Sequence, residues 1–592
     1  MSVDIVKRLV FLLCIVLFLS CSFSSRTKKS DEVQVQPGAL SATGGYSQIL
    51  LTWESSKAAV QYGIQRSATE TGPFTEITTS QISTYIDKGL ADESLWYYRI
   101  RAFDASGHEA FSNIAWAKTQ RLNRISMADP KANALTRALF EHLQGITAKR
   151  EAGSGILTGQ DAAYGVGLFM YHSEKDGKHS DVHTLTGKAP AVVSYDAASI
   201  VGDWWNESDP WYHDIMSESQ ANYKKWMKAQ HEAGGFNTLH WHMRNYVNGG
   251  SYSDGPHELW RIAPPEVCAQ MTSRNLSVPN AGSHFLVFKA KVDILCDWLL
   301  ELKDSSGHTI PVVFRPFHEN SGEWFWWGKT RDRDSQVPLA EYQASLRGIW
   351  KWMVEYMSET RGVHNLIWAI SPNGHGSWDP YTAEEYLMYS PDPAYIDIFG
   401  FDQYVTKEYS SKSGDWEGGV IPEVTMIVEL AREHHKAMAI TEGGFDWGFS
   451  PMTLKHNRVI REENGNTYID WELAVDENRI PVPIGPLDQH YRYEPSNNQR
   501  DFVPCTLEES TIWHWWTEKT IGKINDIGGV AYYVIWSNGV PGPADNPKNS
   551  LVYGPVPGNH TGDDFIDGWK RGIILLAGEG KGGKPASLYY SK

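Results

Sequence analysis

Two glutamates in this sequence could carry out chemistry together. Glu319 follows an apolar run in "VVFRPFHENSGEWFWWG", and Glu442 follows another in "AMAITEGG". Two carboxyl groups across a cleft are the minimum machinery for glycoside hydrolysis, because one protonates the leaving oxygen while the other attacks the anomeric carbon. A single glutamate at a strand end is more often an ion-pair partner, so the interpretation depends on the pair.

The two carboxyl groups must have different pKa values for this chemistry to work. We expect crowding by Trp324 and by the second carboxylate to raise the pKa of Glu319, so that it stays protonated. We expect hydrogen-bond donors near Glu442 to keep that group ionised. If the reaction retains the anomeric configuration, the two carboxyl groups should lie about 5–5.5 Å apart.

The composition favours a carbohydrate ligand. The 592 residues include 25 tryptophans, more than a core of this size needs. Flat aromatic rings stack on the apolar faces of sugars, although some families simply pack their cores with tryptophan. The formal net charge is −17, so nucleic acid is not an expected partner.

The elements that must position these residues form an α/β pattern. From about residue 123, eight apolar runs alternate with longer helical patterns, which predicts a (β/α)8 TIM barrel. The runs are GILTGQ from 155, AVVSYD from 191, FNTLHWH from 236, PVVFRPFHE from 311, NLIWAISPN from 365, IDIFGFDQY from 396, AMAITEGG from 437 and VAYYVIWSN from 530. Polar or aromatic residues end each run, where barrel enzymes keep their active sites. We expect loop-rich insertions over about 246–284 and 450–509.

Residues 33–120 predict a separate, small all-β sandwich of the immunoglobulin-like type. Short alternating runs are separated by turn residues, which is the pattern of antiparallel sheets. The residues expected to face its core are Ile49, Leu51, Trp53, Trp96, Tyr98, Ile100 and Ala102. The segment resembles a fibronectin type III module. We interpret it as a spacer, with sugar binding as the less favoured alternative.

The first residues predict export and lipid anchoring. Residues 1–20 carry basic residues followed by a short apolar segment, which is typical of a signal peptide. They end in "FLSC", which resembles a bacterial lipobox with lipidation at Cys21, and residues 21–32 would form a tether. An ordinary secreted protein is the alternative. The expected location is the bacterial cell envelope, with the protein attached to the membrane through Cys21.

The remaining cysteines do not form a metal-binding pattern. Cys268, Cys296 and Cys505 have no CxxC or Cys/His spacing of a zinc site. One disulfide is possible among them, but the sequence does not assign it.

Several motifs resemble glycoside hydrolase family 26, and its β-mannanases in particular. "RPFHENSGEWFWWG" resembles the acid/base motif of that family, and "GILTGQ", "PAVVSYD", "TLHWHMRN", "YIDIFGFDQY", "ITEGG", "YYVIWSN" and "PGNHTGDDF" resemble family stretches in the right order. The resemblance covers most of residues 130–570 apart from the two insertions. It implies a retaining (β/α)8 glycosidase over residues 123–580, acting as an endo-β-1,4-mannanase on mannan-type polysaccharide. It implies no metal or organic cofactor.

The same resemblance implies roles for individual residues. Glu319 would be the general acid/base and Glu442 the nucleophile. The residues implied in substrate binding are His242 on the glycone side, Arg315 bracing the carboxylates, His318 beside the acid, Tyr404 on the nucleophile with Asp402 next to it, and Trp324 and Trp536 as aromatic platforms. Asp196, Trp326, Trp327 and Trp378 are weaker candidates for the cleft.

Two departures from the family pattern bear on sugar binding. Tyr246 stands where a proline is usual, and Ser537 stands where several members have a basic residue. Both positions concern the glycone-side sugars, so chain-length preference is left open. The catalytic pair is unaffected by them.

Three alternatives compete with the mannanase interpretation. His240 and His242 point to one face of a strand and could form a metal pair, but the fifth and eighth runs end in "SPN" and "WSN", which do not supply the further ligands of a metal-dependent hydrolase. A non-catalytic glycan-binding lipoprotein would also use the aromatics and the anchor, but it needs no catalytic carboxylates. A β-1,3-1,4-glucanase or β-1,3-xylanase of the same family is the third.

Overall fold

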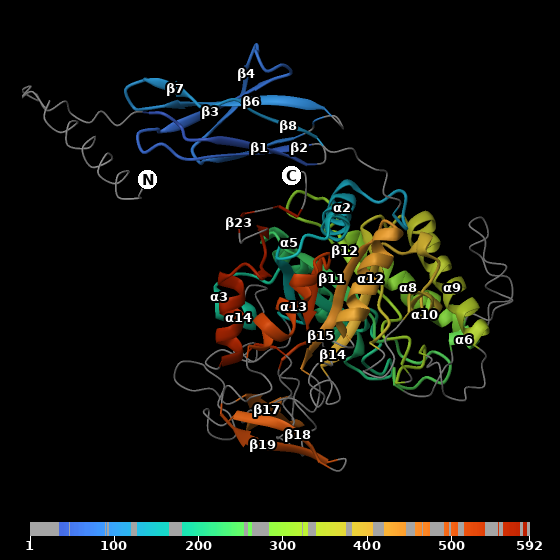
Figure 1. The fold of residues 1–592 in the computed structure, drawn as a ribbon. Coiled ribbons are helices and arrows are strands. Elements are labelled where there is room, and N and C mark those ends of the chain that lie inside the picture. Colours follow the sequence, from blue (N-terminus) through green and yellow to red (C-terminus); the bar gives the residue numbers. More distant parts are fainter. Residues whose placement is uncertain are drawn as a thin grey trace, which may run out of the picture. The chain divides into compact units, whose positions relative to one another are not determined.

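A computed structural model of the chain divides into two compact units, residues 1–124 and 125–592 (Figure 1). The structure describes residues 35–45, 48–88, 90, 94–119, 127–164, 180–253, 259–262, 283–322, 324–328, 339–374, 382–405, 420–445, 456–463, 466–473, 490–496, 499–506, 514–538, 554–555, 560–580, 584–585 and 587–588. The predicted signal peptide, Cys21 and the tether lie outside these residues. Among the helices described, none combines the length and apolar character needed to cross a membrane.

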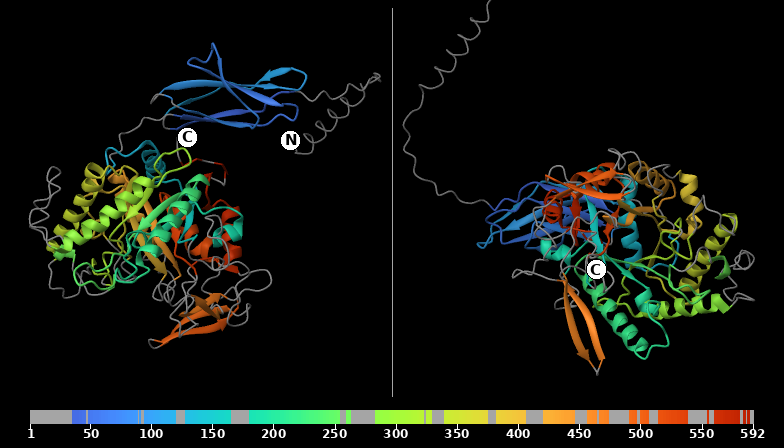
Figure 2. Two further views of the ribbon diagram at one scale, coloured as in Figure 1. Left: turned by 180° about the vertical axis from the view of Figure 1, so that it is seen from behind. Right: turned by 90° about the horizontal axis from the view of Figure 1, so that it is seen from below.

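The first unit consists of two antiparallel sheets (Figure 2). One contains β1 (Leu40–Gly45), β2 (Gln48–Trp53) and β5 (Thr84–Lys88); the other contains β3 (Gln61–Ser67), β4 (Thr75–Ser80), β6 (Leu95–Phe103), β7 (Glu109–Phe111) and β8 (Ala115–Lys118). Both sheets contribute to one core, in which six of the predicted residues are buried: Ile49, Leu51, Trp53, Tyr98, Ile100 and Ala102. Trp96 is half-buried and packs against it. The predicted bounds of 33 and 120 and the fibronectin type III resemblance stay predictions.

The second unit is built around a closed barrel of eight parallel strands, as predicted. Its strands are β9 (Ile156–Asp161), β10 (Val192–Asp196), β11 (Phe236–His240), β12 (Val312–Arg315), β13 (Leu366–Ile370), β14 (Ile398–Val405), β15 (Ala437–Phe445) and β20 (Tyr532–Ile535). They pair in chain order, and β9 closes the barrel by pairing with both β10 and β20. A short strand, β21 (Ile574–Leu575), pairs with the start of β9.

Helices lie outside the strands, as Figure 1 shows. They are α3 (Asp181–Thr186), α4 (Ala198–Val201), α5 (Tyr212–Glu232), α6 (Leu259–Ile262), α8 (Ser283–Glu301), α9 (Leu339–Glu355), α10 (Ala383–Met388), α12 (Ile421–Glu433), α13 (Ile521–Ile527) and α14 (His560–Lys570), with single turns η2 (Tyr356–Thr360), η3 (Pro393–Tyr395) and η5 (Trp515–Lys519). Strand residues facing outward pack against these helices in the larger core.

The barrel interior forms a second core with α2 (Ala134–Lys149), the helix that precedes the first strand. Leu139, Phe140 and Leu143 of α2 are buried together with inward-facing strand residues such as Val313 and Ile367. The helix begins at an N-cap, Asn133, whose side chain accepts a hydrogen bond from the backbone N–H of Thr136. The barrel is therefore a packed core, and chemistry is left to the ends of its strands.

The prediction that the insertion over 450–509 consists mainly of loops is wrong. That segment contains two antiparallel hairpins, β16 (His456–Glu463) with β17 (Asn466–Leu473) and β18 (His490–Ser496) with β19 (Gln499–Cys505). The sequence carries a signal for the first, because an Asn-Gly dipeptide at 464–465 between two alternating runs is typical of a tight hairpin. A further small pair joins β22 (Glu579–Gly580) to β23 (Lys584–Pro585).

Of the three remaining cysteines, Cys296 lies on α8 and Cys505 ends β19. Cys296 on α8 is a buried free thiol, and burial raises its pKa to about 12. Cys268 lies outside the described residues.

Candidate active site

The predicted site residues lie at the carboxyl ends of neighbouring strands. Asp196, His240 and Arg315 are the last residues of β10, β11 and β12, and strand pairing sets Asp196 opposite His240 and His240 opposite Arg315. Asp402 on β14 pairs with Glu442 on β15. Parallel pairing in this register therefore brings residues far apart in the sequence to one end of the barrel.

Glu319 is held by a strained turn that follows β12. Phe317 has a φ of 54° and Glu319 a φ of 51°, the left-handed region that residues other than glycine rarely adopt. The backbone N–H of Glu319 donates to the carbonyl of Ser371, at the end of β13, over 2.7 Å. Strain of this kind costs about 1–3 kcal/mol per residue and persists only where the surroundings impose it. The turn thus fixes the direction of the Glu319 side chain.

Glu442 is held by donors on both of its carboxylate oxygens. Arg315 Nη2 donates to Oε2 over 2.6 Å, and the Tyr404 hydroxyl donates to Oε1 over 2.5 Å. The guanidinium of Arg315 is buried. The hydrogen-bond donors expected near Glu442 are therefore present.

Asp402 anchors the other side of Arg315. Its Oδ2 accepts from Arg315 Nη1 and from the Ser371 hydroxyl, the latter over 2.9 Å, while Oδ1 accepts from the Thr441 hydroxyl over 2.6 Å. Asp402 is only 1% exposed, as is Arg315. Their burial favours bracing of Glu442 over direct contact with a sugar.

The surroundings of Glu319 favour its protonated form. Burial, followed by the charges of Glu442 and Asp402, raises the pKa of Glu319 well above its usual range. The expected direction for a general acid is therefore found. The expected effect of Trp324 is wrong, because its indole N–H donates to Glu319 Oε2 over 2.6 Å and so lowers that pKa by stabilising the anion.

The aromatic run after Glu319 divides into one exposed ring and a buried cluster. Trp324 is 45% exposed, as a platform requires. Trp326 and Trp327 are fully buried, and their indole N–H groups donate to the carbonyls of Met243 and His318, each over 2.8 Å. The prediction that Trp326 and Trp327 line the cleft is therefore wrong. Both are core residues that hold the turn. Trp378 lies outside the described residues.

Three histidines meet beside the carboxylates. The His242 ring centroid lies 4.7 Å from that of His318 and 5.1 Å from that of His240. Burial and the charge of Arg315 lower the pKa of His318 well below its usual range, so its ring is neutral. Trp536 is half-buried, with its ring 5.7 Å from His240. These contacts bring His242, His318 and Trp536 into one group, and their roles in substrate binding stay predictions.

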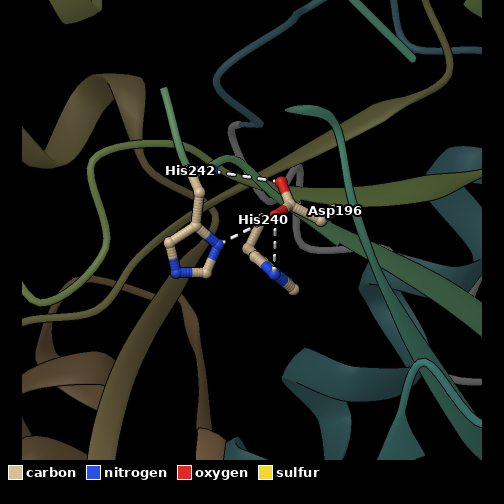
Figure 3. Close-up of side chains that lie close together, drawn as sticks. All are labelled: Asp196, His240 and His242. Carbon is tan, nitrogen blue, oxygen red and sulfur yellow. Dashed lines mark hydrogen bonds and ion pairs between the residues drawn. The ribbon is translucent and has the colours of Figure 1, made fainter. Parts of the chain in front are cut away.

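Two carboxylates orient the histidines. Asp196 Oδ2 lies 2.8 Å from His242 Nδ1 and 3.8 Å from His240 Nε2 (Figure 3). On the other side of His240, Nδ1 lies 3.0 Å from the Ser194 hydroxyl and 3.6 Å from Asp161 Oδ1. The His240 ring is therefore fixed from both of its nitrogens.

An aromatic group around His242 was missed from the sequence. Rings of Trp204, Tyr252 and Phe325 lie 5.6, 4.9 and 5.4 Å from the His242 ring. Trp204 is 43% exposed and follows α4, so it presents a second open indole near the site. Nothing in the sequence distinguishes Trp204 from its neighbour Trp205, since the choice depends on how the loop folds.

The unusual Tyr246 is a buried structural residue. Its hydroxyl donates to Asp203 Oδ2 over 2.5 Å, and the Trp241 indole donates to the same oxygen over 2.9 Å. Ser537 is also buried. Tyr246 therefore anchors the loop after β11 through Asp203.

More than half of the chain matches a known protein family. The model of the family described as "Glycosyl hydrolase family 26" matches residues 128–448. A mannan endo-1,4-beta-mannosidase of Bifidobacterium adolescentis is 28% identical over 326 residues, which cover 54% of this chain and 28% of the relative. One from Bacillus subtilis is 25% identical over 300 residues, covering 50% of this chain and 72% of the relative.

Solved structures give a similar result. A modular endo-beta-1,4-mannanase from Cellulomonas fimi has 25% sequence identity and a TM-score of 0.52, covering 78% of this chain and 80% of that structure. The catalytic domain of an endo-beta-1,4-mannanase from Bacillus sp. JAMB-750 has 26% identity and a TM-score of 0.52, covering 76% of this chain and 94% of that structure.

Proposed function

The chain belongs to glycosyl hydrolase family 26, and we propose that it is an endo-β-1,4-mannanase that hydrolyses mannan-type polysaccharide with retention. The observation that carries this proposal is the pair Glu319 and Glu442, one with a raised pKa and the other held by two donors. The relatives named mannan endo-1,4-beta-mannosidase support the choice of substrate.

Glu319 acts first as the acid. It enters the reaction protonated because its surroundings disfavour the anion, and it gives its proton to the oxygen of the glycosidic bond. Glu442 attacks the anomeric carbon as that bond breaks, which leaves a glycosyl ester on Glu442 and releases the first product. Glu319, now ionised, takes a proton from water, the water oxygen attacks the same carbon, and free Glu442 is regenerated.

Arg315 and Tyr404 prepare Glu442 for attack. Their hydrogen bonds hold the two oxygens in fixed directions before substrate binds, so little reorganisation is needed in the transition state. Trp324 keeps its indole N–H on Glu319 while its ring is exposed toward solvent. We assign His242, His318, Trp324 and Trp536 to sugar binding, and Arg315 and Asp402 to bracing.

Product analysis on three polysaccharides tests the proposal. Plain β-1,4-mannan should be cut internally to short oligosaccharides, whereas mixed-linkage β-1,3-1,4-glucan and β-1,3-xylan should not be cut. Glu319→Ala and Glu442→Ala should each abolish the cleavage of mannan. Cleavage of glucan or xylan in preference to mannan would replace the substrate, and cleavage of mannan that survives either substitution would reject the mechanism.

We also propose that Cys21 carries a lipid that attaches the enzyme to a bacterial envelope membrane. The support is the sequence alone, namely a short apolar segment that ends in "FLSC". Expression in a bacterial host with radiolabelled fatty acid should label the wild-type chain. The Cys21→Ala variant should not be labelled, because it lacks the attachment site. Labelling that persists in Cys21→Ala would contradict the proposal.

A further inference from the structure

The group of Asp196, His240 and His242 has the composition of a metal site. One possible ligand atom from each residue lies within 4.8 Å of the others, and Figure 3 shows the two rings converging on the one carboxylate. Two imidazoles and a carboxylate are a set that binds zinc and similar transition metals. Asp196 and His242 are only partly exposed and His240 is buried, which distinguishes this group from exposed acidic clusters.

The distances suit one small ion. Zinc lies about 2.0–2.2 Å from nitrogen or oxygen ligands, so one ion can bridge ligand atoms up to about 4.2 Å apart. Asp196 Oδ2 is 2.8 Å from His242 Nδ1 and 3.8 Å from His240 Nε2, both within that reach. The nitrogens of His240 and His242 lie within 4.8 Å of each other, so a small turn of the His242 ring toward His240 brings in the third ligand.

His240 has the outer contacts of a metal ligand. Metal-binding histidines usually donate their second N–H to a hydroxyl, carbonyl or carboxylate, which fixes the ring. Ser194 and Asp161 occupy this place at His240 Nδ1, at 3.0 and 3.6 Å, and Nε2 is left on the side of Asp196. The metal-facing nitrogen is therefore preset by its neighbours.

A buried nitrogen without a partner lies beside the group. Nδ1 of His318 forms no hydrogen bond within the described residues, although His318 is only 1% exposed. The His318 ring lies 5.5 Å from that of His240 and 4.7 Å from that of His242. This buried nitrogen is open to a ligand of the site, because no described protein group satisfies it.

We propose that Asp196, His240 and His242 form a binding site for one divalent transition-metal ion, for which zinc is the best match. The ion displaces a proton from the contact between Asp196 and His242. Because His242 lies beside Trp536 and Trp204, an ion there occupies space that the proposed function gives to a sugar. Zinc therefore acts as a reversible inhibitor of hydrolysis; this inhibition rests on the proposed function, but zinc binding does not.

Calorimetric titration of the chelator-treated full chain with zinc chloride tests the binding. We expect one zinc per wild-type chain, with this binding event lost in Asp196→Asn and in His240→Ala. Ser194→Ala should weaken binding by about tenfold, because it loosens His240 without removing a ligand. The control is His434→Ala combined with His435→Ala, which removes an adjacent pair at the end of α12 and should leave the binding event unchanged.

Anomalous scattering from a zinc-soaked crystal of the wild-type chain decides the matter independently of how the variants fold. A zinc peak between Asp196, His240 and His242 is expected. A peak only elsewhere, no binding by the wild type, or unchanged binding by a folded Asp196→Asn would each reject the site. A chain that binds zinc here but does not cleave mannan would contradict the proposed function and leave the metal site standing.

Discussion

Arg315 and Glu442 form a buried ion pair in which Nη2 lies 2.6 Å from Oε2. The same guanidinium binds Asp402 through its other terminal nitrogen, so one planar group fixes two carboxylates on adjacent strands. A lysine offers a single point charge and cannot hold both in this geometry. The position of the proposed nucleophile thus depends on two donor nitrogens in one plane, which only the guanidinium of arginine supplies.

Arg315→Lys should therefore lower kcat for mannan by about a hundredfold, because a nucleophile displaced by about 1 Å loses a factor of this size. The measurement is steady-state hydrolysis at saturating substrate. Arg66→Lys is the control, since Arg66 pairs with Asp87 in the first unit and is 28% exposed, so it reports the effect of the same substitution away from the site. An Arg315→Lys enzyme with wild-type kcat would show that bracing is unnecessary.

Tyr404→Phe should lower kcat/KM by about ten- to a hundredfold. The change removes the donor at 2.5 Å from Glu442 Oε1, and hydrogen bonds to charged groups contribute about 1.5–3 kcal/mol. Tyr395→Phe is the control. The Tyr395 hydroxyl donates to Glu355 Oε1 in a hydrogen bond of 2.9 Å, and this pair does not lie at the strand ends. Equal losses in the two variants would mean that the effect is structural.

Trp324→Phe should move the basic limb of the kcat/KM profile to higher pH. The indole N–H stabilises the Glu319 anion and lowers its pKa, so its removal raises that pKa further. Glu319 then keeps its proton, and its ability to act as acid, to a higher pH. Phenylalanine preserves a ring for stacking. A basic limb that stays in place or moves to lower pH would contradict the assignment of Glu319 as the acid.

Trp204→Ala should raise KM for mannan-derived oligosaccharides several-fold with little change in kcat. KM rises because an aromatic contact of this kind contributes about 1 kcal/mol. The value of kcat changes little because the described contacts of Trp204 are with His242 and Tyr252, and not with either carboxyl group. Trp116→Ala is the control, because Trp116 is 61% exposed on β8 of the first unit. A larger effect of Trp116 would instead favour sugar binding by that unit.

Tyr246→Phe should destabilise the fold by about 1 kcal/mol, through the lost hydrogen bond to Asp203. Burial raises the pKa of Asp203 to about 6, above its unfolded value, while Tyr246 and Lys291 act in the opposite direction. The hydroxyl stabilises the anion, so its loss should cost more above pH 6 than below it. Urea unfolding at several pH values measures this. A loss that is greater at low pH would contradict the role of Asp203 as a buried anion.

The barrel strands and the strand-end positions of Glu319 and Glu442 were readable from the sequence because their signals are local. Each strand is a short apolar run, and its polar end marks the face that carries the site, as at Val312–Arg315 before Glu319. The hairpins at 456–505 were missed, although the Asn-Gly dipeptide at 464–465 is a local signal too. The Asn-Gly dipeptide, and not the length of the segment, is what indicates strand pairing there.

Sequence alone determined the order of the strands, the position of Glu319 and Glu442, and the family. Only the tertiary structure decided which tryptophans are open, since Trp324 and Trp327 are three residues apart yet one is 45% exposed and the other 0%. It also decided that the Trp324 N–H opposes the raised pKa of Glu319, and that Asp196 completes the pair His240 and His242. The physical reason is that exposure and charge environment come from groups distant in the chain, which strand register and loop path bring together.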